Sequence, residues 1–521
     1  MKRILLAVAC VVSMPGALSG AAYDLIIHGG RVIDGMGNPA FHADIAVQNG
    51  RIAAVGRLES KDAKSVLDAS GLVVAPGFID VHTHAEDILE LPLGENFARM
   101  GVTTIIAGNC GSSETDIAGF LRRIAETNVA LNVATLIGHG SVRSQVMGGS
   151  FMRPPTAEEL DTMRQRVEQA MKDGAVGLST GLIYLPGTFA KTEEIIELAK
   201  VTARYDGVYV SHMRDEGEAI MNALEELFRI AREGHLRAHV SHIKLTGKSN
   251  WNQTGRVLEA IERARAEGLD ITQDQYTYTA SSTGFSQLVP EKFREGGKFK
   301  DRLADPEEKS RMIAEMKAKL KARAETDYAY AVIANYEYDR SLNGLNLVAA
   351  SRKARGSDSL DDQIELILEI QKNGGANGIF HGISEDDLRL FLAHPNTMFA
   401  SDSGTRRFGE GVPHPRGYGN NVRVLGRYAR ELKLLRLEEA VRRMTSLPAT
   451  VFRLKDRGLI REGCWADLVV FDPAKVQENT RFNDPHHYAT GFAWVLVNGV
   501  PVVENDRHTQ ARSGQAVRAG H

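Results

Sequence analysis

The sequence contains very few cysteines. Only Cys10, Cys110 and Cys464 occur among 521 residues. Small secreted domains that depend on disulfides carry many closely spaced cysteines, so this pattern excludes a disulfide framework. Stability must come from a packed core, for which a 43% share of hydrophobic residues is ample.

The chain also lacks an excess of charge of either sign. Its 63 Lys and Arg residues nearly balance 66 Asp and Glu residues, which leaves a formal net charge of -3. Proteins that bind nucleic acid need a basic surface to neutralise phosphates. We therefore expect no nucleic-acid partner and consider a small molecule instead. No residue pattern indicates an oligomeric state.

No hydrophobic run is long enough to span a membrane, which takes roughly 20 residues. The apolar run at residues 4–12 follows two basic residues and precedes small ones. This order predicts a signal peptide over residues 1–21, and therefore a periplasmic or secreted protein. A lipoprotein anchored through Cys10 is disfavoured, because Ala7 is a poor residue three places before it.

Short strand-like runs separated by turns occupy both ends of the chain. Asn49-Gly50 and Asn498-Gly499 each separate two such runs and predict β-hairpins. Gly29-Gly30 predicts a further turn between strands. We expect one small β-sandwich-like domain built from residues 22–70 and 455–510.

Between these ends, strand-like runs alternate with helical patterns, which is typical of a parallel α/β fold. One helix is predicted over residues 216–232. Eight candidate strands occur, at residues 72–81, 103–107, 133–137, 176–179, 208–211, 238–241, 270–273 and 398–400. Eight strands predict a TIM (β/α)8 barrel over residues 71–454. The stretch at 279–378 is too long for an ordinary connection and contains a charged helical segment at 305–325, so we expect an insertion that covers the barrel mouth.

Residue types that bind zinc stand at five of the predicted strand ends. Histidines two positions apart in an extended chain point the same way and can converge on one ion. Each residue alone has an equally ordinary structural role, as a buried cysteine or a helix-capping aspartate. Together they predict a zinc site where barrel active sites assemble. The six residues are His82, His84, Cys110, His212, His242 and Asp402.

Several segments resemble one known family. They are Pro-Gly-Phe-Ile-Asp-Val-His-Thr-His at 76–84, Gly-Asn-Cys-Gly at 108–111, Gly-Leu-Ser-Thr-Gly-Leu at 177–182, Ser-His-Met-Arg-Asp-Glu at 211–216, Ser-His-Ile-Lys at 241–244 and His-Pro-Arg-Gly-Tyr-Gly at 414–419. Over about residues 23–505 the chain is similar to the D-aminoacylases, the N-acyl-D-amino-acid deacylase branch of the amidohydrolase superfamily. The His-x-His pair is shared by the whole superfamily, whereas a cysteine in place of the usual bridging lysine is specific to this branch.

The resemblance implies a zinc-dependent hydrolase of N-acyl-D-amino acids. Cys110, His212 and His242 would hold one zinc tightly, and His82, His84 and Asp402 would form a second, weaker position. Asp402 would act as general base and then general acid, because an amide nitrogen needs a proton to leave as an amine. An alternative role for Asp402 is to hold His82 or His84 in place.

The same resemblance implies a set of residues that bind the substrate. These are Lys244, Tyr276, Ser282 and Arg416 around the α-carboxylate, and Tyr184 beside the scissile carbonyl. The chain departs from the family pattern at residues 403–411, which are longer and more charged than expected, and at Thr277, where proline is common. Arg406 or Arg407 in this segment would favour an acidic substrate side chain.

Three other functions compete with this interpretation. A cyclic amidase of the hydantoinase or dihydroorotase type generally needs a carboxylated lysine, but Ser179 and Thr180 stand at the end of the fourth predicted strand. A dipeptidase that acts on D-residues differs only beyond the scissile bond and stays open. An inactive ligand-binding barrel would have lost at least one metal ligand, and all six are present.

Overall fold

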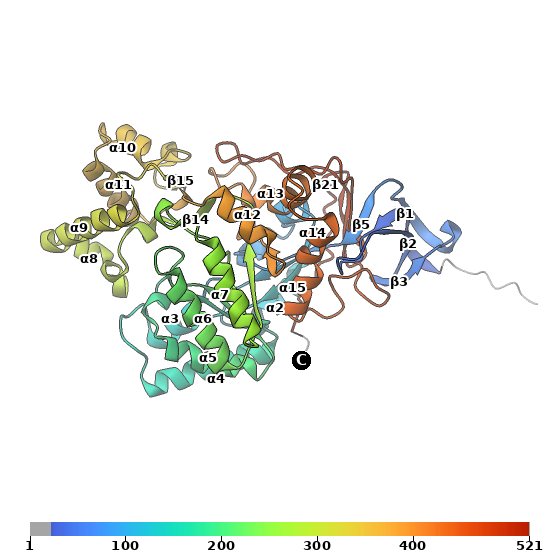
Figure 1. Cartoon of the computed structure of the whole chain (residues 1–521), viewed down its shortest axis with the longest axis horizontal. Coiled ribbons are helices and arrows are strands. Elements are labelled where there is room, and N and C mark those ends of the chain that lie inside the picture. Colours follow the sequence, from blue (N-terminus) through green and yellow to red (C-terminus); the bar gives the residue numbers. More distant parts are fainter. Residues whose placement is uncertain (1–21, 520–521) are drawn as a thin grey trace, which may run out of the picture.

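The computed structural model describes residues 22–519, so the predicted signal peptide lies outside the described residues. Figure 1 shows a β-sheet domain at one end of the molecule, an α/β body in the middle and a mainly helical insertion at the other end. None of the helices between residues 22 and 519 combines the length and apolar character needed to cross a lipid bilayer.

Parallel strands form the centre of the α/β body. One sheet has the order β17-β13-β12-β11-β10-β9 and another the order β6-β7-β8. Their bounds are β6 Phe78–Asp80, β7 Val102–Ala107, β8 Asn132–Thr135, β9 Ile137–Gly138, β10 Gly177–Gly181, β11 Val208–His212, β12 Ala238–Val240, β13 Ile271–Gln275 and β17 Thr397–Phe399. A single residue separates β8 from β9, so one stretch of chain passes from one sheet to the other. At the opposite seam, Asp402 N donates to His82 O over 2.9 Å and His84 N donates to Ser403 O over 2.9 Å.

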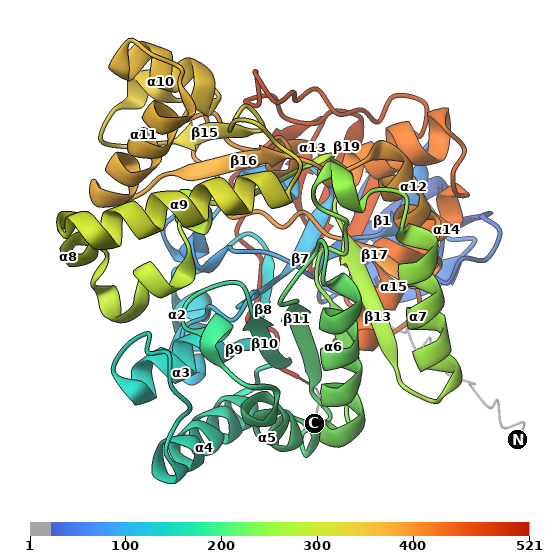
Figure 2. The ribbon, with the colours of Figure 1, turned by 60° about the vertical axis from the view of Figure 1, so that its left-hand side comes forward.

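Helices surround these strands on the outside (Figure 2). Their bounds are α1 Glu95–Ala98, α2 Ile117–Thr127, α3 His139–Met147, α4 Ala157–Asp173, α5 Thr192–Ala203, α6 Ile220–Gly234, α7 Thr254–Ala266, α12 Glu385–Ala393, α13 Arg416–Arg423, α14 Leu437–Met444 and α15 Ser446–Val451. Helix α6 buries Ile220, Leu224, Leu227 and Ile230 on one face, as its spacing predicts. This arrangement agrees with the predicted α/β barrel.

Helix α6 begins later than the sequence pattern predicts. The predicted start is residue 216, but the helix starts at Ile220. The carboxylate of Asp215 accepts hydrogen bonds from the backbone N–H groups of Gly217 and Ala219, over 2.7 and 2.9 Å. These bonds fold the preceding segment into a turn, as aspartate commonly does. Glu216 is therefore free to point into the body instead of along a helix.

The strand predicted over residues 72–81 is wrong as a single element. It divides at Gly77 into β5 (Val73–Pro76), which joins the sheet of the end domain, and β6, which pairs with β7. A Cβ atom at Gly77 would lie 2.3 Å from Thr103 side-chain atoms, so only glycine fits where the chain changes sheets. The run at 133–137 likewise divides, into β8 and β9.

Strands from both ends of the chain form one sheet in the end domain. The order is β21-β20-β19-β18-β5-β1-β2-β3, and β4 pairs with β1. The bounds are β1 Tyr23–Val32, β2 Phe41–Gln48, β3 Arg51–Gly56, β4 Ala63–Asp68, β18 Leu468–Phe471, β19 Phe492–Val497, β20 Val500–Glu504 and β21 Arg507–His508. Both Asn-Gly hairpins are confirmed, as β2–β3 and β19–β20. The turn predicted at Gly29-Gly30 is wrong: β1 continues through it with an irregularity in register, and a Cβ at Gly30 would lie 2.4 Å from Val74.

The insertion has a sheet and a hydrophobic cluster of its own. Its antiparallel sheet has the order β14-β16-β15, and four helices pack beside it. The bounds are β14 Ala280–Gly284, β15 Ala331–Asn335, β16 Asn377–His381, α8 Phe299–Ala304, α9 Pro306–Ala322, α10 Leu347–Arg355 and α11 Leu360–Lys372. Asp305 caps α9 by accepting from the N–H groups of Glu307 and Glu308, and Pro306 suits the first helical position.

A buried ion pair connects the end domain to the barrel strands. Arg457 pairs with Asp467, and each side chain is only 3% exposed. Asp467 also accepts from Asn132 of β8 over 3.1 Å and from the N–H of Asn498 over 2.8 Å. We expect Asp467→Asn to lower the free energy of unfolding by about 3–5 kcal/mol, because it leaves the Arg457 charge buried without a partner.

Chemical denaturation checks this prediction. Glu59→Ala is the control, because it breaks the exposed Lys61–Glu59 pair, whose side chains are 76% and 69% exposed. An exposed pair contributes about 0–1 kcal/mol. Equal losses in the two variants would contradict the structural role of Asp467.

Candidate active site

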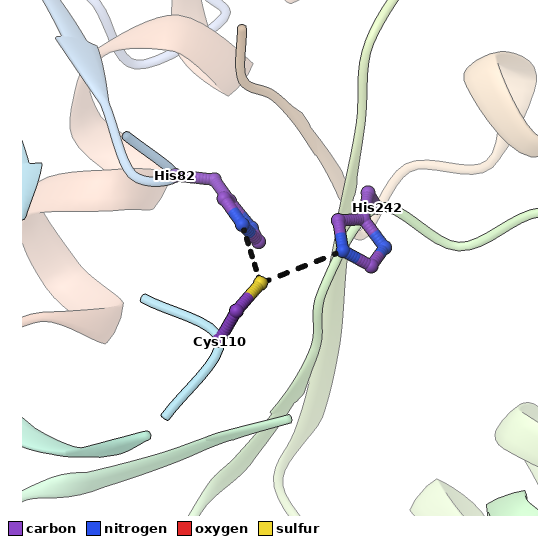
Figure 3. A group of neighbouring side chains, drawn as sticks. All are labelled: His82, Cys110 and His242. Carbon is purple, nitrogen blue, oxygen red and sulfur yellow. Dashed lines mark hydrogen bonds between the residues drawn. The ribbon is translucent and has the colours of Figure 1, made fainter. Parts of the chain in front are cut away.

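Four of the predicted zinc ligands meet around one sulfur atom. Cys110 Sγ lies 3.3 Å from His82 Nε2, 3.6 Å from His212 Nδ1 and 3.8 Å from His242 Nε2. Figure 3 shows the sulfur between the rings of His82 and His242. Typical zinc–ligand bond lengths in a tetrahedral site place sulfur about 3.6 Å from each nitrogen. The residues of this cluster therefore fit a zinc ion.

A second cluster shares His82 with the first. Asp402 Oδ1 lies 3.2 Å from His84 Nε2 and 3.7 Å from His82 Nε2. The sequence prediction assigned Cys110 to one metal position and His82 to the other. In the structure the sulfur is nearer to His82 than to either other imidazole, so it lies between the two groups. The donor atoms can form two adjacent cation positions that adjoin at Cys110 and His82.

Three of these residues have a strained backbone. The φ angles of Cys110, His242 and Asp402 are 53°, 33° and 50°. Residues other than glycine rarely adopt positive φ, and such strain gathers at functional sites where the surroundings enforce it. The chain turns sharply at each of these strand ends, which directs the three side chains to the common centre.

The turn that carries Cys110 is fixed by its neighbours. Asn109 Nδ2 donates to the backbone oxygens of Val81, Thr83 and Ile106, over 3.2, 3.4 and 2.9 Å. These bonds tie the cysteine to the segment that carries the His-x-His pair. Gly108 has a φ of 80°, and a Cβ there would lie 2.3 Å from Leu136 O. Glycine is therefore required immediately before this turn.

The electrostatics of the site favour the ionised forms that bind metal. Burial raises the pKa of the Cys110 thiol, but the charge of His82 and hydrogen bonds with the imidazoles outweigh this effect and hold the pKa well below its usual value. Burial also opposes ionisation of Asp402. The charges of Arg416 and His82 outweigh it, and the pKa of this carboxyl lies well below its ordinary range. Thiolate and carboxylate are the forms that coordinate cations.

Two carboxylates behind the ligands were missed in the sequence analysis. The first is Asp274, at the end of β13. Its carboxylate accepts from His239 Nε2 over 2.8 Å and from the His242 backbone N–H over 2.9 Å, and it lies 3.4 Å from His82 Nδ1. The rule that selected the other residues, a metal-binding type at a strand end, also applies to Asp274. Its contacts orient the ring of His82.

The second is Glu216, which lies in the Ser-His-Met-Arg-Asp-Glu segment. Its Oε1 lies 2.9 Å from His242 Nδ1 and 2.5 Å from Lys244 Nζ. His242 Nδ1, which faces away from Cys110, therefore contacts both this carboxylate and Lys244 Nζ, the latter over 2.7 Å, and these contacts fix the orientation of the ring. Burial opposes ionisation of Glu216, but the charge of Lys244 outweighs it and lowers the pKa.

We expect Glu216→Gln to weaken zinc binding by about 10–100-fold, as loss of a partner behind a ligand does. The amide keeps the size of the side chain but no longer balances the charge of Lys244. Titration with a competing chelator measures the affinity. Glu218→Gln, two positions along, serves as the control because Glu218 lies outside both clusters. Equal zinc affinities for the two variants would remove Glu216 from the metal site.

Some of the predicted substrate residues line a cavity and others are buried behind it. A cavity of about 1060 Å³ opens beside the metal cluster, and Tyr184, Ser282 and Arg416 line it. Lys244 and Tyr276 are absent from its lining and are buried, with 2% and 0% exposure. Lys244 forms an ion pair with Glu216. The Tyr276 hydroxyl has no hydrogen-bond partner among the described residues.

Arg416 faces the reaction centre. Its Nη1 lies 2.8 Å from Asp402 Oδ2, and its guanidinium lies 4.7 Å from the centre of the Tyr276 ring. Thr283 donates to the hydroxyl of Tyr184 over 3.2 Å, so the insertion contributes to this wall of the cavity. The structure thus brings Asp402 and Arg416 together, while Lys244 lies away from the cavity surface.

Known proteins are similar to this chain in both sequence and fold. A model described as the amidohydrolase family matches residues 65–503. D-aminoacylase of Alcaligenes xylosoxydans xylosoxydans is 36% identical over 95% of this chain and 97% of its own length. N-acyl-D-glutamate deacylase of the same organism is 34% identical over 92% and 93%.

A solved structure agrees with these relatives. The crystal structure of N-acyl-D-glutamate deacylase from Bordetella bronchiseptica, complexed with zinc and a phosphonate that mimics the tetrahedral intermediate, superposes with a TM-score of 0.82 at 33% identity. The match covers 95% of this chain and 100% of the other, which confirms the predicted fold class. The chain belongs to the amidohydrolase family and, within it, to the D-aminoacylase branch.

Proposed function

We propose that this protein hydrolyses the N-acyl amide bond of N-acyl-D-amino acids, giving a carboxylate and a free D-amino acid, with zinc as cofactor. The observation that carries the proposal is the Cys110 thiolate enclosed by imidazoles beside the Asp402–Arg416 pair, at the wall of a large cavity. The named relatives support the reaction and the D configuration of the substrate.

Cys110, His212 and His242 would hold one zinc, and His82, His84 and Asp402 a second cation. A zinc ion held there would supply Lewis acidity toward the substrate carbonyl and would lower the pKa of water to about 7.

The protein's own residues supply proton transfer and orientation. Asp402 is ionised and lies at the cavity wall, so it can accept the proton of the attacking water at a carboxylate oxygen and deliver it to the amide nitrogen. The leaving group then departs as a neutral amine. Arg416, with its planar fork of donors, would bind the substrate α-carboxylate; its Nη1 lies 2.8 Å from Asp402 Oδ2.

An activity panel tests the proposal. The purified protein is loaded with zinc and incubated with N-acetyl-D-amino acids, N-acetyl-L-amino acids, D-dipeptides and a hydantoin, and free amine or ring opening is measured. We expect hydrolysis of N-acetyl-D substrates. Faster cleavage of D-dipeptides would support the dipeptidase alternative, because that substrate differs only on the acyl side. Hydrolysis of the hydantoin alone would overturn the proposal.

We further propose a periplasmic or secreted location, supported by the basic, apolar and small residues in sequence order over residues 1–21. Cell fractionation and N-terminal sequencing of the mature protein test it. An intact first residue in the cytoplasmic fraction would contradict it.

A further inference from the structure

The cations of the site differ in whether the protein itself supplies a counterion. Arg416 pairs with Asp402 over 2.8 Å, and Lys244 pairs with Glu216 over 2.5 Å. Exposed Arg407 lies 3.8 Å from Glu90.

Arg406 is the exception. It lines the cavity and is half-buried, and its Nε donates to Ser403 Oγ over 3.3 Å. Within residues 22–519 no carboxylate lies within ion-pair distance of its guanidinium, and the charges of Asp87 and Asp402 act on it only from farther away. Burial and the charge of Arg416 lower the pKa of Arg406. A partly desolvated charge without a partner is unfavourable, so an anion that enters the cavity gains a pre-existing counterion here.

The segment that carries Arg406 is held in place before any ligand binds. The N–H of Arg406 donates to Asn96 Oδ1 over 3.1 Å, and Asn96 Nδ2 donates to the backbone oxygens of Gly404 and Gly417, over 3.3 and 3.0 Å. Thr405 donates to the carboxylate of Asp87. The backbone that carries the cation is therefore preorganised, which reduces the entropy lost when Arg406 binds an anion.

Arg406 also lies close to Arg416. A Cβ atom on Gly417, the residue after Arg416, would lie 3.4 Å from Arg406 Nε. Both side chains line the cavity, and the charge of Arg416 is near enough to lower the pKa of Arg406. If Arg416 binds the substrate α-carboxylate, Arg406 is left for a second anionic group on the same small molecule.

The rest of the cavity wall is mainly polar and made of small residues. Four carboxylates also line the cavity: Asp402 pairs with Arg416 and Glu90 with Arg407, and the other two are Asp87 and Glu410. Hydroxyl and amide side chains predominate over the few apolar ones, Leu91, Leu185, Pro186, Ala334 and Pro413. Examples of the polar lining residues are Ser141, Ser144 and Asn335. Such a wall gives little hydrophobic gain to a large aliphatic or aromatic side chain, and it is compatible with a hydrated, charged one.

We propose that Arg406 determines substrate specificity by binding the side-chain carboxylate of an acidic N-acyl-D-amino acid, N-acyl-D-glutamate or N-acyl-D-aspartate. This inference rests on the proposed deacylase function and names the substrate class of the same site. A guanidinium binds a carboxylate through two parallel charged hydrogen bonds, which are stronger than bonds between neutral groups.

Isosteric substrates test the proposal in the unmodified protein. N-acetyl-D-glutamate and N-acetyl-D-glutamine have nearly the same shape and differ in side-chain charge. We expect kcat/KM to be about 10–100-fold higher for the glutamate, because the glutamine compound cannot form the charged hydrogen bonds with Arg406. N-acetyl-D-leucine should be poorer still. Equal or faster hydrolysis of the glutamine compound would overturn this inference while leaving the deacylase function intact, whereas no hydrolysis of any N-acetyl-D compound would overturn the proposed function itself.

A pair of adjacent variants locates the effect. Arg406→Met should remove the preference for glutamate over glutamine by raising KM for the glutamate, with little change for the glutamine. Arg407→Met, its exposed neighbour, is the control and should keep the preference. Thermal denaturation of both variants shows whether they fold. An unchanged preference in Arg406→Met would overturn the role of Arg406, and if that variant does not fold, the substrate pair in the unmodified protein decides.

Discussion

Asp402→Asn is expected to lower kcat for N-acyl-D-amino-acid hydrolysis by about 10²–10⁴-fold, the range that general acid–base groups contribute. The amide keeps the size of the side chain and an oxygen toward His84, which lies 3.2 Å from the carboxylate. It has no basic oxygen to accept the proton of the attacking water. Steady-state kinetics with N-acetyl-D-amino acids measures the loss.

Zinc content separates this role from a purely structural one. If Asp402 served only to hold His82 or His84, the variant would lose metal and activity together. We expect elemental analysis to show that the tightly held zinc remains, because Cys110, His212 and His242 are unchanged. Glu410→Gln, which removes another carboxylate from the cavity wall, serves as the control and should keep its turnover. Near-normal turnover of Asp402→Asn would exclude Asp402 from proton transfer.

The division of the effect between kcat and KM is a further expectation. Arg416 is paired with Asp402 in the structure, so neutralising Asp402 leaves the guanidinium more available to the substrate carboxylate. KM should therefore fall or stay constant while kcat falls. A loss of transition-state stabilisation with ground-state binding retained is the signature of a group that acts in the chemical step. A large rise in KM would instead indicate that Asp402 shapes the binding site.

The strand-end rule explains why much of the site could be predicted from the sequence. Side chains at the carboxyl ends of parallel strands lie along one edge of the barrel. A histidine, cysteine or aspartate at such a position is therefore expected to point into the common mouth. His82, Cys110 and His242 were each selected in this way, and the structure brings them within hydrogen-bonding distance of one sulfur. Asp274 directly follows the predicted strand 270–273, so the same rule applied to it would have selected it.

Other features depend on contacts that a local pattern does not contain. Glu216 is the first residue of the helix predicted over residues 216–232. In the structure, the turn formed by Asp215 excludes it from that helix. Lys244, which the resemblance assigns to the substrate carboxylate, pairs with Glu216 in the structure and is absent from the cavity lining. The change of sheet at Gly77 follows from the position of Thr103, which is distant in sequence. At Glu216 and Gly77, tertiary contacts overrode the local signal.

Cys110→Ala is expected to release the tightly held zinc. Loss of a residue that only supports a ligand lowers metal affinity by up to about 100-fold, so loss of the ligand itself should lower it by more. The sulfur lies 3.3–3.8 Å from nitrogens of three imidazoles, and removing it leaves no donor at the centre of the cluster. Thiolate is also the softest ligand available here and suits zinc best.

Cys464 provides a matched control for this substitution. It is the other described cysteine, it is also buried, and it packs in the hydrophobic cluster of the end domain. Cys464→Ala removes the same atom from the chain and should keep its zinc when analysed by elemental analysis after dialysis against a chelator. Thermal denaturation of both variants in the presence of excess zinc distinguishes metal loss from unfolding. Zinc retained equally by both variants would show that the thiolate is not a ligand, and the proposed hydrolase would then lack the centre on which its chemistry depends.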